Sequence, residues 1–227
     1  MSRGDTNLPP ATDAPRTPGT PDDLPLRRIS DARTLRALTH PIRVALIEML
    51  SIRGPMTATE AGERLGESPA SCSFHLRQLA RYGFVEEAGG GKGRARPWRM
   101  TQIGMTFSSV HADPETQVAA AALWRLIRGR QVARYETWRQ SQASYPDAWR
   151  EAGIDMENVL WVTPEELDAL GRRLGDELIT LYRDRLTDPA QRPEGSLPVE
   201  LLVLGYPIEP PAASGTDPDA GTDTGPA

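Results

Sequence analysis

Between Ser68 and Thr101, a run of hydroxyl, amide and guanidinium side chains precedes a glycine-rich basic turn. At about 100° per residue, a helix over the first part would present these groups on one face. Such groups can hydrogen-bond base edges and phosphates in a major groove, so the chemistry they predict is recognition of a polyanion. The residues of this face, with the expected N-cap, are Ser68, Ala70, Ser71, Ser73, Phe74, Arg77, Gln78 and Arg81.

Phe74 is the aromatic residue on this face, where exposure to water would be unfavourable. In a major groove its ring could meet a thymine methyl. A partly buried phenylalanine in a folded domain is an equally open interpretation. Cys72, Leu76 and Leu79 follow at i, i+4 and i+7 and are predicted to face the core.

A basic hairpin is expected after this helix, because FVEEA and RPWRM are short strand-like runs joined by GGGKGRA. Lys92, Arg94, Arg96 and Arg99 place four positive charges on or beside it. This arrangement is typical of a wing that lies along a phosphate backbone, although a solvated basic turn would look the same. A nucleotide-binding P-loop is excluded, because no hydroxyl residue follows Lys92.

The elements that position this stretch can be recognised from their start and stop signals. Ser30 is expected to cap a first helix over 30–39, and His40-Pro41 to start a second that runs to about Ile52. The apolar stripe predicted on the second helix is Ile42, Leu46, Met49 and Leu50. Thr57 and Glu60 have capping-box spacing, and Ser68-Pro69 starts another helix just beyond Gly66. Two helices joined by so tight a turn predict a helix-turn-helix.

The segments ALTHPIRVALIEML and MTATEAGERLGESPASCSFHLRQLARYGFVEE, with the Arg-rich wing before WRMT, resemble the ArsR-type winged-helix transcriptional regulators over residues 30–106. The resemblance implies a homodimer that binds an operator repeat in double-stranded DNA through the helix from Ser68 to Tyr82. It places His75 at the family's "HL" position, as a packing or phosphate-contacting residue. The implied DNA-binding set is therefore Ser68, Ala70, Ser71, Ser73, Phe74, His75, Arg77, Gln78, Arg81, Lys92, Arg94 and Arg96.

Metal sensing of the type known in that family is not expected, because the helix TATEAGERL carries no cysteine pair. Cys72 is interpreted as a core residue in preference to a ligand or redox switch. With one cysteine and three histidines, a Cys/His metal cage is hard to build. No cofactor is predicted. The chain lacks GxSxG, HExxH, Rossmann and P-loop patterns, so an enzyme is not expected.

Charge is segregated along the chain, which carries a net −5 overall. Residues 27–110 hold 13 basic and 7 acidic side chains, a net +6, and the remainder holds 13 and 24, a net −11. A basic module joined to an acidic one suits a protein that binds a polyanion with one half. No apolar run approaches the roughly 18 residues of a membrane span, so a cytoplasmic location is expected.

The acidic half begins with a helical pattern from Pro114 to Gln142 that has more apolar surface than a small domain can cover. It is predicted to pack on its counterpart in a second chain, with an intrachain core helix as the alternative. MENVLWVT and PVELLVLGYP are predicted strands, and Thr163-Pro164 starts a helix between them with a leucine stripe. Glu165, Glu166 and Asp168 are explained by that helix start rather than by catalysis. The four tryptophans here suit core packing, a dimer interface or a ligand pocket.

The predicted fold class is mostly α (α+β), a winged helix-turn-helix domain followed by a long helix and a small α+β C-terminal module. The expected divisions are a disordered tail (1–26), the DNA-binding domain (27–110), a dimerisation or effector module (111–206) and a disordered acidic tail (207–227). The predicted function is sequence-specific regulation of transcription by a homodimer, with a possible small-molecule effector. The alternative is a winged-helix module that binds protein or RNA.

Overall fold

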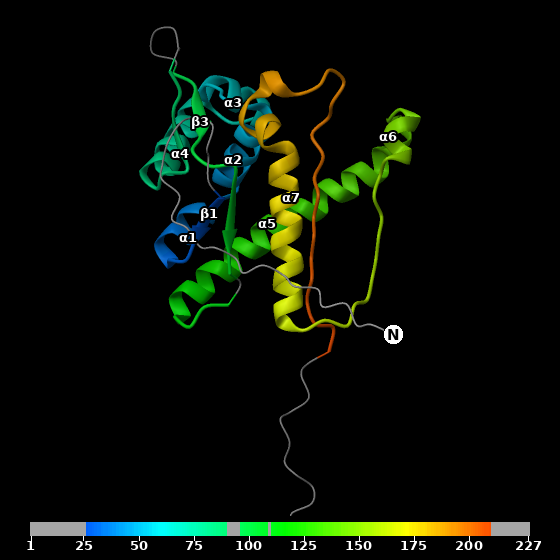
Figure 1. Ribbon diagram of the computed structural model, residues 1–227. Coiled ribbons are helices and arrows are strands. Elements are labelled where there is room, and N and C mark those ends of the chain that lie inside the picture. The colour runs from blue at the N-terminus through cyan, green and yellow to red at the C-terminus, as the bar shows by residue number, and fades with distance from the viewer. Residues whose placement is uncertain (1–25, 90–95, 109, 210–227) are drawn as a thin grey trace, which may run out of the picture.

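The computed structural model of the chain describes residues 26–89, 96–108 and 110–209, and Figure 1 shows their arrangement. Helices dominate these residues, and the strands form two-stranded sheets, which confirms the mostly helical class. The predicted tails lie almost wholly outside the described residues. In chain order the elements are β1 (Leu26–Ile29), α1 (Ala32–Leu38), α2 (Pro41–Arg53), α3 (Ala58–Leu65), α4 (Pro69–Arg81), β2 (Val85–Glu87), β3 (Trp98–Met100), β4 (Gly104–Phe107), α5 (Pro114–Ser141), η1 (Gln142–Ser144), α6 (Asp147–Glu151), α7 (Pro164–Thr187) and η2 (Pro189–Gln191).

The core lies in the first half of the chain, where α2 packs against α4 and β3, and α1 packs against α5. α2 is covered by α4 and β3, so the apolar residues that it buries differ from the predicted stripe. Its buried side chains are Val44, Leu46, Ile47 and Leu50. The prediction had Ile42 and Met49 in place of Val44 and Ile47, and those two are only partly buried.

The helix starts follow the local capping signals closely. Thr57 and Glu60 form both hydrogen bonds of a capping box at α3, and His40 caps α2 ahead of Pro41. The first helix is an exception, because Asp31 rather than Ser30 is its N-cap. The Asp31 carboxylate accepts a hydrogen bond from the backbone N–H of Thr34 at 2.8 Å. That backbone hydrogen bond also holds the pKa of Asp31 below its usual range.

Two strands of the first half were not predicted. β1 pairs in parallel with β4, so that Leu26 lies opposite Gly104 and Ile29 opposite Phe107. The side chain of Ile29 is buried in the core. β1 therefore attaches the start of the described chain to the segment that leads into α5.

α5 confirms the predicted long helix and spans 28 residues. Its buried residues are Thr116, Ala119, Ala120 and Leu123, all in its first ten positions. Farther along, Val132 is 51% exposed and Tyr135 is 49% exposed. The small domain therefore fully buries side chains only in the first part of this helix.

The C-terminal module differs from the prediction in its strands. Residues 156–163 and 198–207 were predicted to be strands, but both run extended without strand pairing. The helix between them is present as α7, with Thr163 and Glu166 in a capping box. Gly205 lies against α7, where an added Cβ would be 2.9 Å from Leu167 Cδ1. The second extended segment therefore runs beside α7, as Figure 1 shows.

Candidate nucleic-acid interface

α4 begins where the sequence places a proline after a serine. Ser68 is the N-cap, its Oγ accepts a hydrogen bond from the Ser71 backbone N–H at 3.1 Å, and Pro69 occupies the first turn. Proline fits there because its fixed φ suits a helix and the missing N–H has no helical partner. The helix is therefore positioned by signals within four residues of its start.

The turn between α3 and α4 depends on two glycines. Gly66 ends α3 in the left-handed region at φ 68°. Gly62 lies so close to the next turn that an added Cβ would be 2.6 Å from the backbone oxygen of Glu67. This close approach, which no pattern in the sequence indicated, sets the spacing between α3 and α4.

The two faces of α4 separate as predicted. Cys72, Leu76 and Leu79 are each 0% exposed in the core. On the other side Phe74 is 51% exposed, although its ring also contacts His75 edge-on at 5.1 Å between centroids. The predicted face includes the exposed Ser68, Ala70, Arg77 and Arg81, and the partly buried Ser71, Ser73 and Gln78.

His75 lies on the inward side of α4 and is only 8% exposed. Its ring stacks on His40, the N-cap of α2, with 4.3 Å between centroids. Its Nδ1 has no hydrogen-bond partner. Burial, followed by the nearby His40 and Arg43, lowers the pKa of His75. The structure thus groups His75 with the core contacts of α4 and not with its outward face.

The hairpin of β2 and β3 lies beside α4. The two glutamates of β2 face arginines on the other side of the hairpin. Arg99 lies opposite Glu86, and its Nε donates a hydrogen bond to the Glu86 carboxylate at 2.8 Å. Arg96 Nη1 lies 2.8 Å from a Glu87 carboxylate oxygen. Both pairs are largely exposed. Their charges partly cancel, so the net positive charge of the wing depends on Lys92 and Arg94, which lie outside the described residues.

A connection at the base of the hairpin was not predicted. Met56, between α2 and α3, exchanges two backbone hydrogen bonds with Trp98 of β3, at 3.1 and 2.8 Å. The helix-turn-helix and the wing are thereby joined through the residues that follow α2.

Cys72 is buried, and this burial raises the pKa of its thiol.

Within the described ranges, no cluster of three or more His, Cys, Asp or Glu side chains could hold a metal ion. No helix among those residues is long and apolar enough to cross a membrane.

Comparison with known proteins identifies the class of this domain. Residues 38–88 match the family described as a helix-turn-helix domain, and this range holds α2, α3, α4 and β2. With the hairpin beside it, the chain carries a winged helix-turn-helix, the kind of domain with which many transcription regulators bind DNA.

Among solved structures, the chain is similar to a mutant of Lactococcus lactis ZitR, at 14% sequence identity and a TM-score of 0.26. The alignment covers 60% of this chain and 73% of that one. No curated protein matches the chain.

Proposed function

We propose that this protein is a sequence-specific DNA-binding transcription regulator of the ArsR type that acts as a homodimer. The observation that carries the proposal is the outward face of α4, where an exposed Phe74 lies among Arg77, Gln78 and Arg81 on a helix whose other face is core. A helix-turn-helix family match over residues 38–88 supports the same function.

In this proposal α4 enters the major groove. Arg77 and Gln78 are suited to base edges, because guanidinium and amide groups can make paired hydrogen bonds there. Ser68, Ser71 and Ser73 lie near the N-terminus of the helix, where hydroxyls and free backbone N–H groups bind phosphate oxygens. His75 would act indirectly, by supporting α4 from within.

The wing would lie along the phosphate backbone. Lys92 and Arg94 are the proposed contacts, while Arg96 shares its charge with Glu87. Each contact that neutralises a phosphate releases counterions, which makes binding depend on salt.

Binding to labelled double-stranded DNA from upstream of the protein's own gene, measured by anisotropy against salt, tests this proposal. Replacing both Lys92 and Arg94 by Ala should lower the log–log salt slope by about 0.9 for each phosphate that is no longer neutralised. A matched control replaces Arg172 and Arg173 on α7 by Ala, and should leave the slope unchanged. Binding of single-stranded RNA in preference to this DNA would favour the alternative interaction module instead.

A second copy of the chain is the proposed partner of α5. The surface left open includes Val132 and Tyr135, and a shallow apolar hollow of about 510 Å³ lies between α1 and the start of α5, lined in part by Val118 and Ala122. The leucine stripe of α7 is a second open apolar surface, since Leu170, Leu174 and Leu178 are each more than one-third exposed. Unpartnered apolar area of this kind marks interaction surfaces.

Charge favours a second copy as this partner. α5 carries five arginines and two glutamates, a net +3, whereas residues 154–209 carry 5 basic and 12 acidic side chains, a net −7. Arg130 and Arg134 pair with Glu48 and Glu200 of the same chain. In a two-fold dimer the other three arginines of α5 could face the acidic module of the second copy.

The mass in solution, measured by light scattering, should be that of two chains. Changing both Val132 and Tyr135 to Glu should shift it toward one chain. The control Val110→Glu, at a position 77% exposed outside the helices, should not. A monomeric wild-type protein would contradict the proposed dimer.

A further inference from the structure

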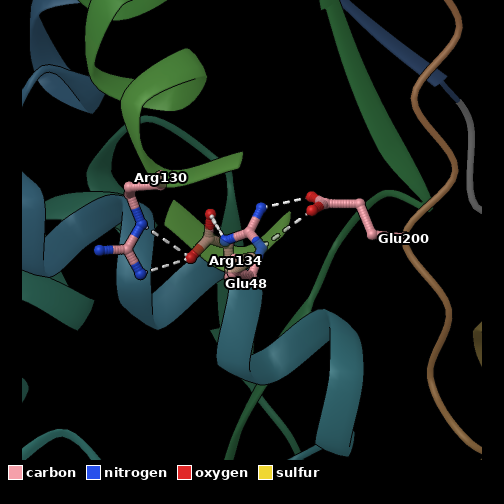
Figure 2. Close-up of polar contacts among 4 residues, drawn as sticks. All are labelled: Glu48, Arg130, Arg134 and Glu200. Carbon is pink, nitrogen blue, oxygen red and sulfur yellow. Dashed lines mark hydrogen bonds and ion pairs between the residues drawn. The ribbon is translucent and has the colours of Figure 1, made fainter. Parts of the chain in front are cut away.

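Four charged side chains join three parts of the chain that lie far apart in sequence (Figure 2). The Glu48 carboxylate of α2 accepts hydrogen bonds from Arg130 Nε at 2.9 Å and Arg134 Nη1 at 2.8 Å. The other edge of the Arg134 guanidinium donates to Glu200, with Nε at 3.1 Å and Nη2 closer. Arg134 thus bridges α2 and the C-terminal extended segment from one position on α5.

This network differs from an ordinary surface ion pair. The side chain of Glu48 is 21% exposed, and those of Arg134 and Glu200 are 39% and 38% exposed. Paired geometry and partial burial both strengthen such contacts relative to exposed single pairs. Hydrogen bonding to Glu200, and then to Glu48, raises the pKa of Arg134.

A second contact holds the same segment to the end of α2. Arg192 donates through Nη1 to the Ile52 carbonyl at 2.7 Å and through Nε to the Arg185 carbonyl at 3.0 Å. It therefore caps the C-terminal ends of α2 and α7 with one positive charge. Beside it Pro189 packs on Gly54, where an added Cβ would be 2.8 Å from Pro189 Cγ.

The end of α2 leads directly to the candidate interface. Two residues after Gly54, Met56 forms its paired backbone hydrogen bonds with Trp98 at the base of the wing. α2 itself packs against α4. A displacement at residues 48–54 would therefore reach both α4 and the hairpin of β2 and β3.

We propose that Glu48, Arg134 and Glu200, with Arg192 on Ile52, form a latch that docks residues 188–200 on the C-terminal half of α2 and stabilises the DNA-binding form of the helix-turn-helix. The closed latch leaves Phe74, Arg77 and Arg81 exposed on α4, so α4 is free to contact DNA in the closed form. Opening the latch lowers affinity for DNA. The DNA readout of this proposal rests on the proposed function.

The test compares Glu200→Gln with Glu194→Gln in the full chain. Both changes remove one negative charge from the same segment, but Glu194 takes part in neither contact of the latch. In Glu200→Gln, amide hydrogen exchange at residues 52–56 and 197–204 should become faster. Affinity for double-stranded DNA should fall by about three- to tenfold, the equivalent of roughly one good ion pair. Glu194→Gln should behave as the wild type in both measurements.

A second variant, Arg134→Lys, keeps the charge but loses the two-edged bridge and should repeat the Glu200→Gln result. Equal exchange in the two glutamate variants would overturn the latch, and faster exchange with unchanged affinity would overturn its coupling to DNA binding. If the wild-type chain bound no DNA, the proposed function would fail. The exchange of residues 52–56 would still decide whether the latch exists.

Discussion

Replacing Phe74 by Ala tests whether this residue is a DNA contact or a core residue. The side chain is 51% exposed, so about half of the 1.5–3 kcal/mol that full burial of a phenylalanine contributes is present in the free protein. The loss in free energy of unfolding should therefore be about 1 kcal/mol. Burying the other half against DNA should contribute a similar amount, so the variant should bind about fivefold more weakly.

The comparison variant is Leu76→Ala, on the opposite face of the same helix and fully buried. It should lose about 2–5 kcal/mol, because it removes buried methyl groups and leaves a cavity. Urea unfolding followed by circular dichroism gives the stabilities, and anisotropy with double-stranded DNA gives the affinities. A stability loss at Phe74 as large as that at Leu76, or an unchanged DNA affinity, would refute the assignment of Phe74 to the interface.

Three further changes test other parts of the site. Glu87→Gln should free Arg96 for phosphate and tighten binding at low salt, measured by anisotropy; weaker binding would count against the wing contact. Because the pKa of His75 is lowered in the folded state, its contribution to stability is complete above its unfolded value near 6.5 and is lost as pH falls. Urea unfolding of His75→Leu should therefore show less destabilisation between pH 7 and 5 than the wild type, and identical pH profiles would contradict this. Gly62→Ala should lower the melting temperature despite the better helix propensity of Ala, since the new Cβ meets the Glu67 carbonyl; a higher melting temperature would show that the turn adjusts freely.

The parts of the fold that follow from neighbouring residues could be predicted from the sequence. The starts of α3, α4 and α7 depend on side chains within three positions, and α5 could be recognised from its long helical pattern. β1 could not be found this way, because its partner β4 lies more than seventy residues away. The bridge from Glu48 through Arg134 to Glu200 is equally nonlocal.

His75 shows how a local signal can be missed. It lies three residues after Cys72 and four before Leu79, a spacing that places it on the buried face of α4. Only apolar residues were assigned to that face, and His75 was predicted to be a packing or phosphate-contacting residue. Its 8% exposure agrees with the packing role. The two predicted C-terminal strands were wrong. Their β-branched and aromatic composition favours strands, but strand propensity depends on a pairing partner, and the described chain supplies none there.

Selection of bound fragments from random double-stranded DNA by the full chain determines whether α4 recognises a specific sequence. A dimer should enrich one short sequence, repeated with two-fold symmetry at a spacing of about one or more helical turns. The same selection with Gln78→Ala should return a consensus that is relaxed within each half-site. Recovery of fragments with no common sequence would contradict the claim that α4 reads DNA.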